Sequence, residues 1–222
     1  MESPFHVPAR LLAHSRAWRV VAGVACLFAA AAMLHFLFEA WQKYTQVDAG
    51  MYGMFWSRRT WLWTHLAGGA TTMLLGALQF VARLRNAWPA LHRWTGRAYL
   101  AGVLVGCIGA AGLVATSPAP FAIRLAFAAT GVAWIATSAM GFIAIRRGQV
   151  QAHRRWMIRS YLVTLAPVTF RVALQLPGLV ALASPVVMIP LLLWLSWVVP
   201  LAAYEVGRER HRLAGPALAQ RA

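Results

Sequence analysis

Long apolar runs separated by short polar connections dominate the chain. Each run holds about 20 residues, the length at which an α-helix crosses the hydrocarbon core of a bilayer. The alternation of apolar and polar residues typical of membrane barrel strands is absent. The pattern therefore predicts an all-α integral membrane bundle. Its six transmembrane helices are expected at residues 17–38, 61–82, 96–114, 121–145, 159–179 and 185–204.

The same pattern divides the chain into a transmembrane domain with a polar segment at each end. We expect residues 1–16 to form a basic cytoplasmic tail, residues 17–204 to form the six-helix domain and residues 205–222 to form a polar cytoplasmic tail. The longest connection, residues 39–60, lies on the outer side and is rich in aromatic residues. Since Trp and Tyr favour the membrane–water interface, we expect this connection to pack on the membrane surface.

Composition agrees with a membrane protein, and the distribution of charge predicts its orientation. The chain is 60% hydrophobic and 12% charged, with a net charge of +16. The predicted outer connections hold few of the 21 Lys and Arg residues, namely Lys43, Arg58, Arg59 and Arg124. The positive-inside rule then predicts that both termini are cytoplasmic, which requires an even number of spans. Basic ends of this kind suit anionic lipid headgroups, so we expect a lipid bilayer and not nucleic acid as the partner.

Two similar segments form an internal repeat. Residues 92–100 and 153–162 both begin with His-Arg and continue to Trp-x-x-Arg-x-Tyr-Leu, and each precedes a long apolar run. The second and third spans flank the first segment, and the fourth and fifth flank the second. This order predicts a parallel repeat of two helical hairpins. The gathering of Arg, Trp and Tyr at membrane interfaces is an alternative origin of the same pattern.

These segments, with others in the same order, resemble a bacterial family of predicted membrane proteins catalogued as domain of unknown function 2306. The resemblance covers residues 60–171 and is carried by His65, Gly-Ala-Leu-Gln-Phe at 76–80, the two His-Arg segments and Val-Thr-Phe-Arg at 168–171. It implies a multi-pass helical membrane protein, and we expect this protein in a bacterial cytoplasmic (inner) membrane. The family brings no established activity, so functional expectations rest on the residues themselves.

Four histidines are predicted to lie in two pairs, one in each leaflet. His35 and His65 each lie about four residues inside the outer end of a predicted span, so they share a depth. His92 and His153 match each other at the inner side. Two imidazoles from facing helices are the axial ligands of a non-covalent haem b. All four are therefore candidate haem ligands, with interfacial or packing roles as the alternative.

Three arginines are candidates for binding an anion near these pairs. Arg97 and Arg155 lie beside the inner pair, and Arg171 lies inside a predicted span towards the outer side. A guanidinium at these positions would bind a haem propionate or another anion. For Arg171 the alternatives are an ion pair with Glu39 or Asp48, or a side chain that snorkels to the interface.

Glycines in the predicted spans have two interpretations. Gly68, Gly96 and Gly106 would make room for a macrocycle between the helices. The alternative is tight helix packing, because small residues allow two backbones to approach closely in a membrane.

Three functions are compatible with these patterns. The first is a haem b electron carrier or membrane oxidoreductase, exchanging electrons with quinone or another redox partner. The second is a transporter of a small anionic solute along a polar path formed by Ser160, Thr164, Arg171 and Gln175, with Pro167 as a helix break. The third is a non-catalytic membrane assembly protein. The sequence does not specify an oligomeric state.

The sequence offers few residues for a metal site or for acid–base catalysis. The two cysteines, Cys26 and Cys107, lie in separate spans, and no spacing typical of a thiolate zinc site or of covalently attached haem occurs, so both are disfavoured. A metal site formed by His35, Glu39 and His65 would have only three ligands, and we predict no metal site. The chain has five acidic residues and no hydrolase or phosphate-binding motif, which disfavours general acid–base catalysis by carboxylates.

Overall fold

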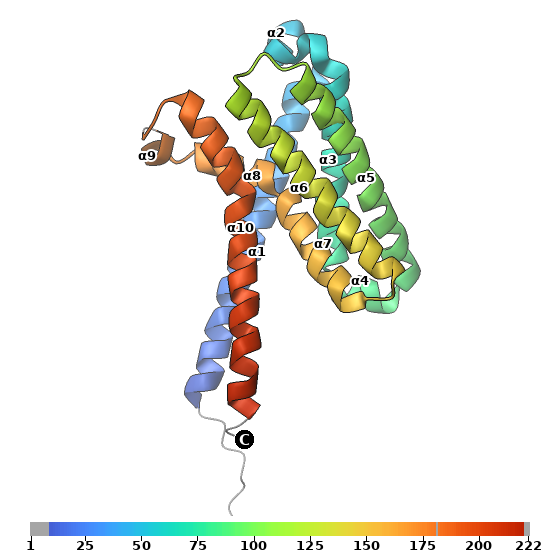
Figure 1. Ribbon diagram of the computed structural model, residues 1–222, viewed down its shortest axis with the longest axis vertical. Helices are drawn as coiled ribbons and strands as arrows, with labels where there is room; N and C mark the ends of the chain where they lie inside the picture. The colour runs from blue at the N-terminus through green and yellow to red at the C-terminus, as the bar shows by residue number, and fades with distance from the viewer. Residues whose placement is uncertain (1–8, 181, 220–222) are drawn as a thin grey trace, which may run out of the picture.

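The structure, a computed structural model, describes residues 9–180 and 182–219, and every regular element among them is a helix (Figure 1). In chain order the elements are α1 (Ala9–Thr45), α2 (Ala49–Tyr52), the 3-10 helix η1 (Gly53–Arg58), α3 (Arg59–Gln79), α4 (Ala82–Ala87), α5 (Pro89–Ala115), α6 (Phe121–Arg146), α7 (Val150–Thr164), α8 (Ala166–Leu174), α9 (Pro177–Val180) and α10 (Pro185–Ala219). The predicted all-α membrane bundle is confirmed.

Five segments are long and apolar enough to cross a membrane. They are Gly23–Thr45, Pro89–Ala115, Phe121–Arg146, Val150–Leu174 and Pro185–Arg210. The remaining predicted span corresponds to α3, which has 21 residues and packs along α5. Six spans with both termini in the cytoplasm stay a prediction.

Helices extend further than the apolar runs that predicted them. α5 begins at Pro89 and α7 at Val150, so both cover residues expected in connections. The fixed φ of proline suits the first position of a helix, which explains the start of α5. Residues 1–8 and 220–222 of the two predicted tails lie outside the described residues, whereas α10 continues through 205–219 without a break. Backbone hydrogen bonding does not need an apolar sequence, so hydropathy predicts the membrane crossing better than the helix ends.

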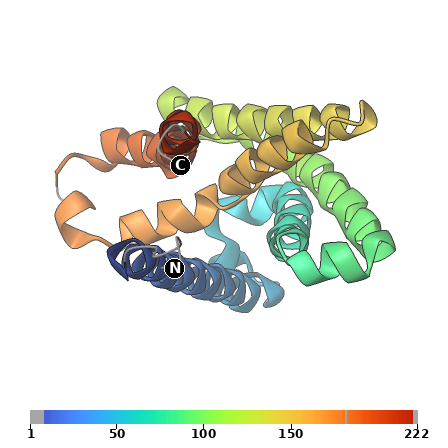
Figure 2. The same cartoon turned by 90° about the horizontal axis from the view of Figure 1, so that it is seen from below.

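The fifth predicted span is broken into α7 and α8 at Leu165. Pro167 has no amide hydrogen to donate to the carbonyl of Val163, so the regular hydrogen-bond pattern cannot continue. The helix restarts where the amides of Val168 and Thr169 both donate to the carbonyl oxygen of Leu165, each at 3.0 Å. Figure 2 shows α7 and α8 running through the middle of the bundle.

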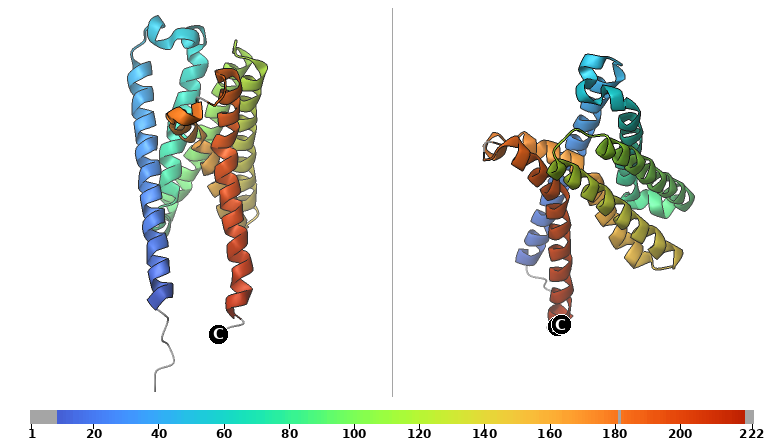
Figure 3. Two further views of the ribbon diagram at one scale, coloured as in Figure 1. Left: turned by 90° about the vertical axis from the view of Figure 1, so that its left-hand side faces the viewer. Right: turned by 45° about the horizontal axis from the view of Figure 1, so that its top comes forward.

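Two helical pairs form the centre of the bundle. α3 packs along α5 and α6 packs along α7, as the predicted hairpin repeat requires. α1 lies against α8, and α10 lies against α6, α7 and α8. Both α1 and α10 extend beyond the central helices at the lower end, where they stand apart from each other (Figures 1 and 3). We call this end of the central helices the basic end, because Arg83, Arg85, Arg93, Arg154 and Arg155 lie there.

The long connection at residues 39–60 folds onto the protein's own helices. The Tyr52 hydroxyl donates to the carbonyl oxygen of Tyr44 at 2.6 Å and accepts from Trp63 Nε1 at 2.7 Å. Arg58 Nη1 donates to the carbonyl oxygen of Leu113 on α5 at 3.3 Å. Residues 39–60 therefore pack on α3 through Tyr52 and on α5 through Arg58.

Glycines bring α3 and α5 into backbone contact. A Cβ atom on Gly68 would overlap the backbone of Gly102 and Gly106, and one on Gly109 would overlap the backbone of His65. The space beside these glycines is therefore filled by the opposite helix. Of the two interpretations of Gly68 and Gly106, tight packing is the one that the structure bears out.

Candidate functional site

A buried network of hydroxyl groups joins α5, α6 and α7. The Tyr99 hydroxyl lies 2.6 Å from Ser160 Oγ and 2.9 Å from Thr164 Oγ1. Ser138 Oγ lies 2.7 Å from Ser160 Oγ, and Trp134 Nε1 donates to Thr164 Oγ1 at 2.8 Å. These five side chains are all buried. The network fixes how α5 and α7 are aligned along their length.

That alignment brings His92 and His153 to one height at the basic end. α5 and α7 are parallel, because α6 runs back between them (Figure 1). His92 precedes Tyr99 by seven residues, and His153 precedes Ser160 by seven. Seven residues are about two helical turns, or roughly 10.5 Å, and return to the same helix face within about 20°. Since Tyr99 and Ser160 touch, the two imidazoles arise at about the same depth, from the sides of α5 and α7 that carry this contact.

The two imidazoles differ in whether their Nδ1 atom is hydrogen-bonded. His153 Nδ1 lies 2.9 Å from the carbonyl oxygen of Gly141 on α6. A carbonyl only accepts, so Nδ1 carries the hydrogen and the Nε2 atom of the neutral ring keeps a free lone pair. His92 Nδ1 is buried and has no hydrogen-bond partner among the described residues. The His153 ring is thus oriented by a hydrogen bond, whereas the His92 ring has a buried nitrogen without a partner.

Two arginines lie near His92, but neither is one of the two that the sequence placed beside the inner pair, Arg97 and Arg155. His92 lies within range of the charges of Arg85, Arg93 and His153. Arg97 is exposed and stacks on the Trp94 ring at 4.9 Å. Arg155 follows His153 by two residues and so leaves α7 on nearly the opposite side, where it lines a groove against α10.

The predicted outer pair lies on two separate interfaces. His65 Nδ1 bonds to the carbonyl oxygen of Gly106 at 2.9 Å, between α3 and α5. His35 is exposed and its Nε2 lies 3.4 Å from a carboxylate oxygen of Glu39, on the side of α1 that faces α8. Equal depth was therefore not enough to bring these two imidazoles together, because His65 faces α5 whereas His35 faces α8.

Arg171 lies with His35 in a groove between α1 and α8. The groove has a volume of about 290 Å³, and its polar residues also include Glu39 and Gln175. The Arg171 guanidinium stacks over the Phe36 ring at 5.7 Å. Glu39, which the sequence offered as an acidic neighbour, lines the same groove without forming an ion pair with Arg171 among the described contacts.

The two repeat segments share one local contact and differ in another. Arg97 stacks on Trp94 at 4.9 Å, and Arg159 stacks on Trp156 at 4.4 Å, each three residues away on its helix. The equivalent tyrosines bind different partners, since Tyr161 donates to the carbonyl oxygen of Met73 at 3.1 Å and not to a hydroxyl network. The shared motif thus gives both helices the same Arg–Trp contact, whereas the contact of each tyrosine depends on the helices that pack against it.

Sequence reasoning missed three contributors to this region. Ser138 and Trp134 on α6 complete the hydroxyl network, and Arg85 on α4 approaches His92. The signal for the first two was a polar serine four residues after a tryptophan inside an otherwise apolar span. No local pattern indicated that α4 would fold back beside α5.

Comparison with known proteins assigns the chain to a family. Residues 62–207, more than half of the chain, match the family described as "Predicted membrane protein (DUF2306)". No curated protein and no solved structure matches the chain. The match extends beyond both His-Arg segments to α10 and so includes all four central helices. The protein therefore belongs to the DUF2306 family of predicted membrane proteins.

Proposed function

We propose that the protein is a membrane electron carrier with a single b-type haem, held by His92 and His153. The observation that carries this proposal is the similar height of the two imidazoles, on the sides of α5 and α7 that carry the contact between Tyr99 and Ser160. A bis-histidine haem needs two imidazoles from neighbouring helices. The earlier expectation of a second haem between His35 and His65 is dropped, because these residues lie on different interfaces.

The donor set fits this group on two counts. A histidine that ligates a metal usually donates its other ring hydrogen to a carbonyl or carboxylate, as His153 does to Gly141. The buried Nδ1 of His92 has no partner among the described residues, and a change of ring orientation would offer either nitrogen to a ligand. Arg85 and Arg93 are the nearby cations for propionates and replace Arg97 and Arg155 in that role.

In this proposal the chain's own residues supply orientation and shielding, and haem when bound supplies one-electron redox chemistry. The Gly141 carbonyl fixes the orientation of the His153 ring. The hydroxyl network of Tyr99, Ser160 and Thr164 holds α5 and α7 in register and closes the interior above the histidines.

A spectrum tests the proposal directly. After expression with sufficient haem, the purified protein should show a Soret band and a sharp α band in the reduced-minus-oxidised spectrum. His92→Ala and His153→Ala should each abolish the α band, because low-spin haem needs both ligands. His35→Ala is the control and should keep it. A wild-type protein without these bands, or a spectrum insensitive to both inner histidines, would contradict the proposal.

Anion transport is a second candidate, favoured by the break between α7 and α8. Discontinuous helices often line transport sites, and Arg171 and Gln175 line a groove beside the break. Ser160 and Thr164, however, lie in the closed hydroxyl network and not in that groove. The predicted polar path is therefore interrupted, and the haem proposal agrees better with the contacts.

A further inference from the structure

A groove lined by arginine runs between α7 and α10 beside the basic end. Arg154 and Arg155 line it from α7, and Arg208 and Arg212 line it from α10. Its volume is about 440 Å³, within the range of small-molecule sites. Ile158 and Tyr204 give it an apolar and aromatic side. The groove therefore combines strong positive charge with contact surface for a hydrophobic molecule.

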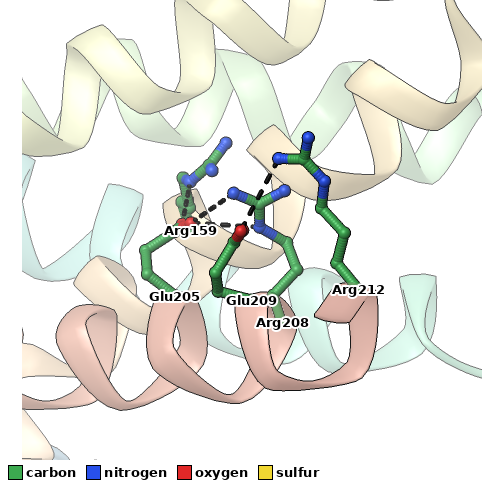
Figure 4. A network of polar contacts seen from close by, with 5 residues as sticks. All are labelled: Arg159, Glu205, Arg208, Glu209 and Arg212. Atoms are coloured by element: carbon green, nitrogen blue, oxygen red, sulfur yellow. Dashed lines mark hydrogen bonds and ion pairs between the residues drawn. The ribbon is translucent and has the colours of Figure 1, made fainter. Parts of the chain in front are cut away.

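Two glutamates of α10 pair with arginines of this cluster, and one of them joins the two walls of the groove. Glu205 on α10 accepts from Arg159 Nε on α7 at 2.6 Å and pairs with Arg208 at 3.0 Å (Figure 4). Glu209 pairs with Arg212 at 3.6 Å. Both carboxylates orient part of the arginine cluster, and Glu205 also joins α7 to α10.

The glutamates leave most of the positive charge uncompensated. The cluster contains five arginines, at 154, 155, 159, 208 and 212, against two glutamates, at 205 and 209, which leaves a net charge of +3. Arg154 and Arg155 form no ion pair among the described residues. Like charges in one groove repel each other, so an anion that binds several guanidinium groups at once would stabilise it.

We propose that this groove binds the phosphate headgroup of an anionic membrane phospholipid. The two helices that form it belong to apolar segments, Val150–Leu174 and Pro185–Arg210, and the groove lies towards their polar ends. That is the depth of lipid phosphates, and basic pockets between transmembrane helices bind such headgroups. Tyr204 is an aromatic residue of the kind that favours the interface. The site is separate from His92 and His153 and does not rest on the haem proposal.

Lipid titration followed by native mass spectrometry tests the site. The protein is purified in detergent and titrated with phosphatidylglycerol or with phosphatidylcholine, which carries the same phosphate but no net charge. Wild-type protein should bind phosphatidylglycerol more tightly. The double variant Arg154→Gln/Arg155→Gln should bind it roughly 30-fold more weakly, because each arginine near a membrane surface strengthens binding about fivefold.

A matched variant controls for general charge. Arg146 and Arg147 lie at the end of α6, are exposed and do not line the groove. Arg146→Gln/Arg147→Gln removes the same charge and should keep wild-type binding. Equal weakening in both double variants, or no preference for phosphatidylglycerol, would overturn the site. Displacement of the lipid by inorganic phosphate at equal concentration would overturn a lipid ligand in favour of a soluble anion. Circular dichroism of each variant checks that the helices remain folded.

Discussion

The α3–α5 interface and the α5–α6–α7 interface hold the same bundle together in different ways. α3 and α5 meet backbone to backbone through Gly68, Gly102, Gly106 and Gly109. α5, α6 and α7 meet through side chains that form a hydroxyl network around Ser160. The first interface depends on the absence of side chains, and the second depends on specific polar atoms.

The difference follows from the lipid environment. Apolar side chains gain little by leaving lipid for a helix interface, so helices associate through close packing and through polar contacts. A closely packed interface has no room for an added atom. The loss of a hydrogen bond between membrane helices lowers the unfolding free energy only modestly, because the polar groups also find partners in the unfolded state. The glycine interface should therefore be the more sensitive of the two to a small change.

The largest effect is expected for Gly68→Ala. The added methyl group would overlap the backbone of Gly102 and Gly106, so α3 and α5 would have to separate. Overpacking of this kind costs about 1–3 kcal/mol of unfolding free energy. The neighbouring Gly69 has open space for a Cβ atom, so Gly69→Ala is the control and should be neutral or stabilising. Unfolding by denaturing detergent measures both. Equal stability of the two variants would show that the glycine contact is unimportant.

A smaller effect is expected for Tyr99→Phe. The substitution removes the hydroxyl that lies between Ser160 and Thr164 and keeps the ring. Hydrogen bonds between membrane helices contribute about 0.6 kcal/mol on average and up to about 1.7 kcal/mol, and we expect a loss in that range. Tyr204→Phe, outside the network, should leave stability unchanged in the same unfolding assay. A loss greater than that of Gly68→Ala would reverse the proposed ranking of the interfaces.

The smallest effect is expected for Glu205→Gln, at the water-exposed end of α7 and α10. The substitution weakens the contacts with Arg159 and Arg208. The Glu205 side chain is 37% exposed, so water screens the ion pairs and their loss should cost about 0.2–1 kcal/mol. Glu209→Gln, whose partner Arg212 is more exposed, is the control and should have no measurable effect. High salt should reduce the difference between the two variants.

Hydropathy predicted the membrane class and the approximate position of every long helix. It did so because a span needs a run of apolar residues that is visible locally. It placed the start of α5 and α7 too late, since helix ends beyond the hydrocarbon core depend on backbone hydrogen bonds and on residues such as Pro89. Pro167 was a local signal for the break at Leu165. No local signal indicated that the predicted polar path would be interrupted there.

The histidines separate what the sequence determined from what the tertiary structure decided. The sequence by itself determined the depth of each imidazole, because depth follows from counting residues along a helix. It could not determine which helices are neighbours. The fold decided that α5 and α7 align through Tyr99 and Ser160, which gives His92 and His153 a similar height. It also decided that His65 faces α5 and that His35 faces α8, which separates these two residues. Helix contacts depend on the shape and polarity of whole interfaces, and no single segment of the chain contains that information.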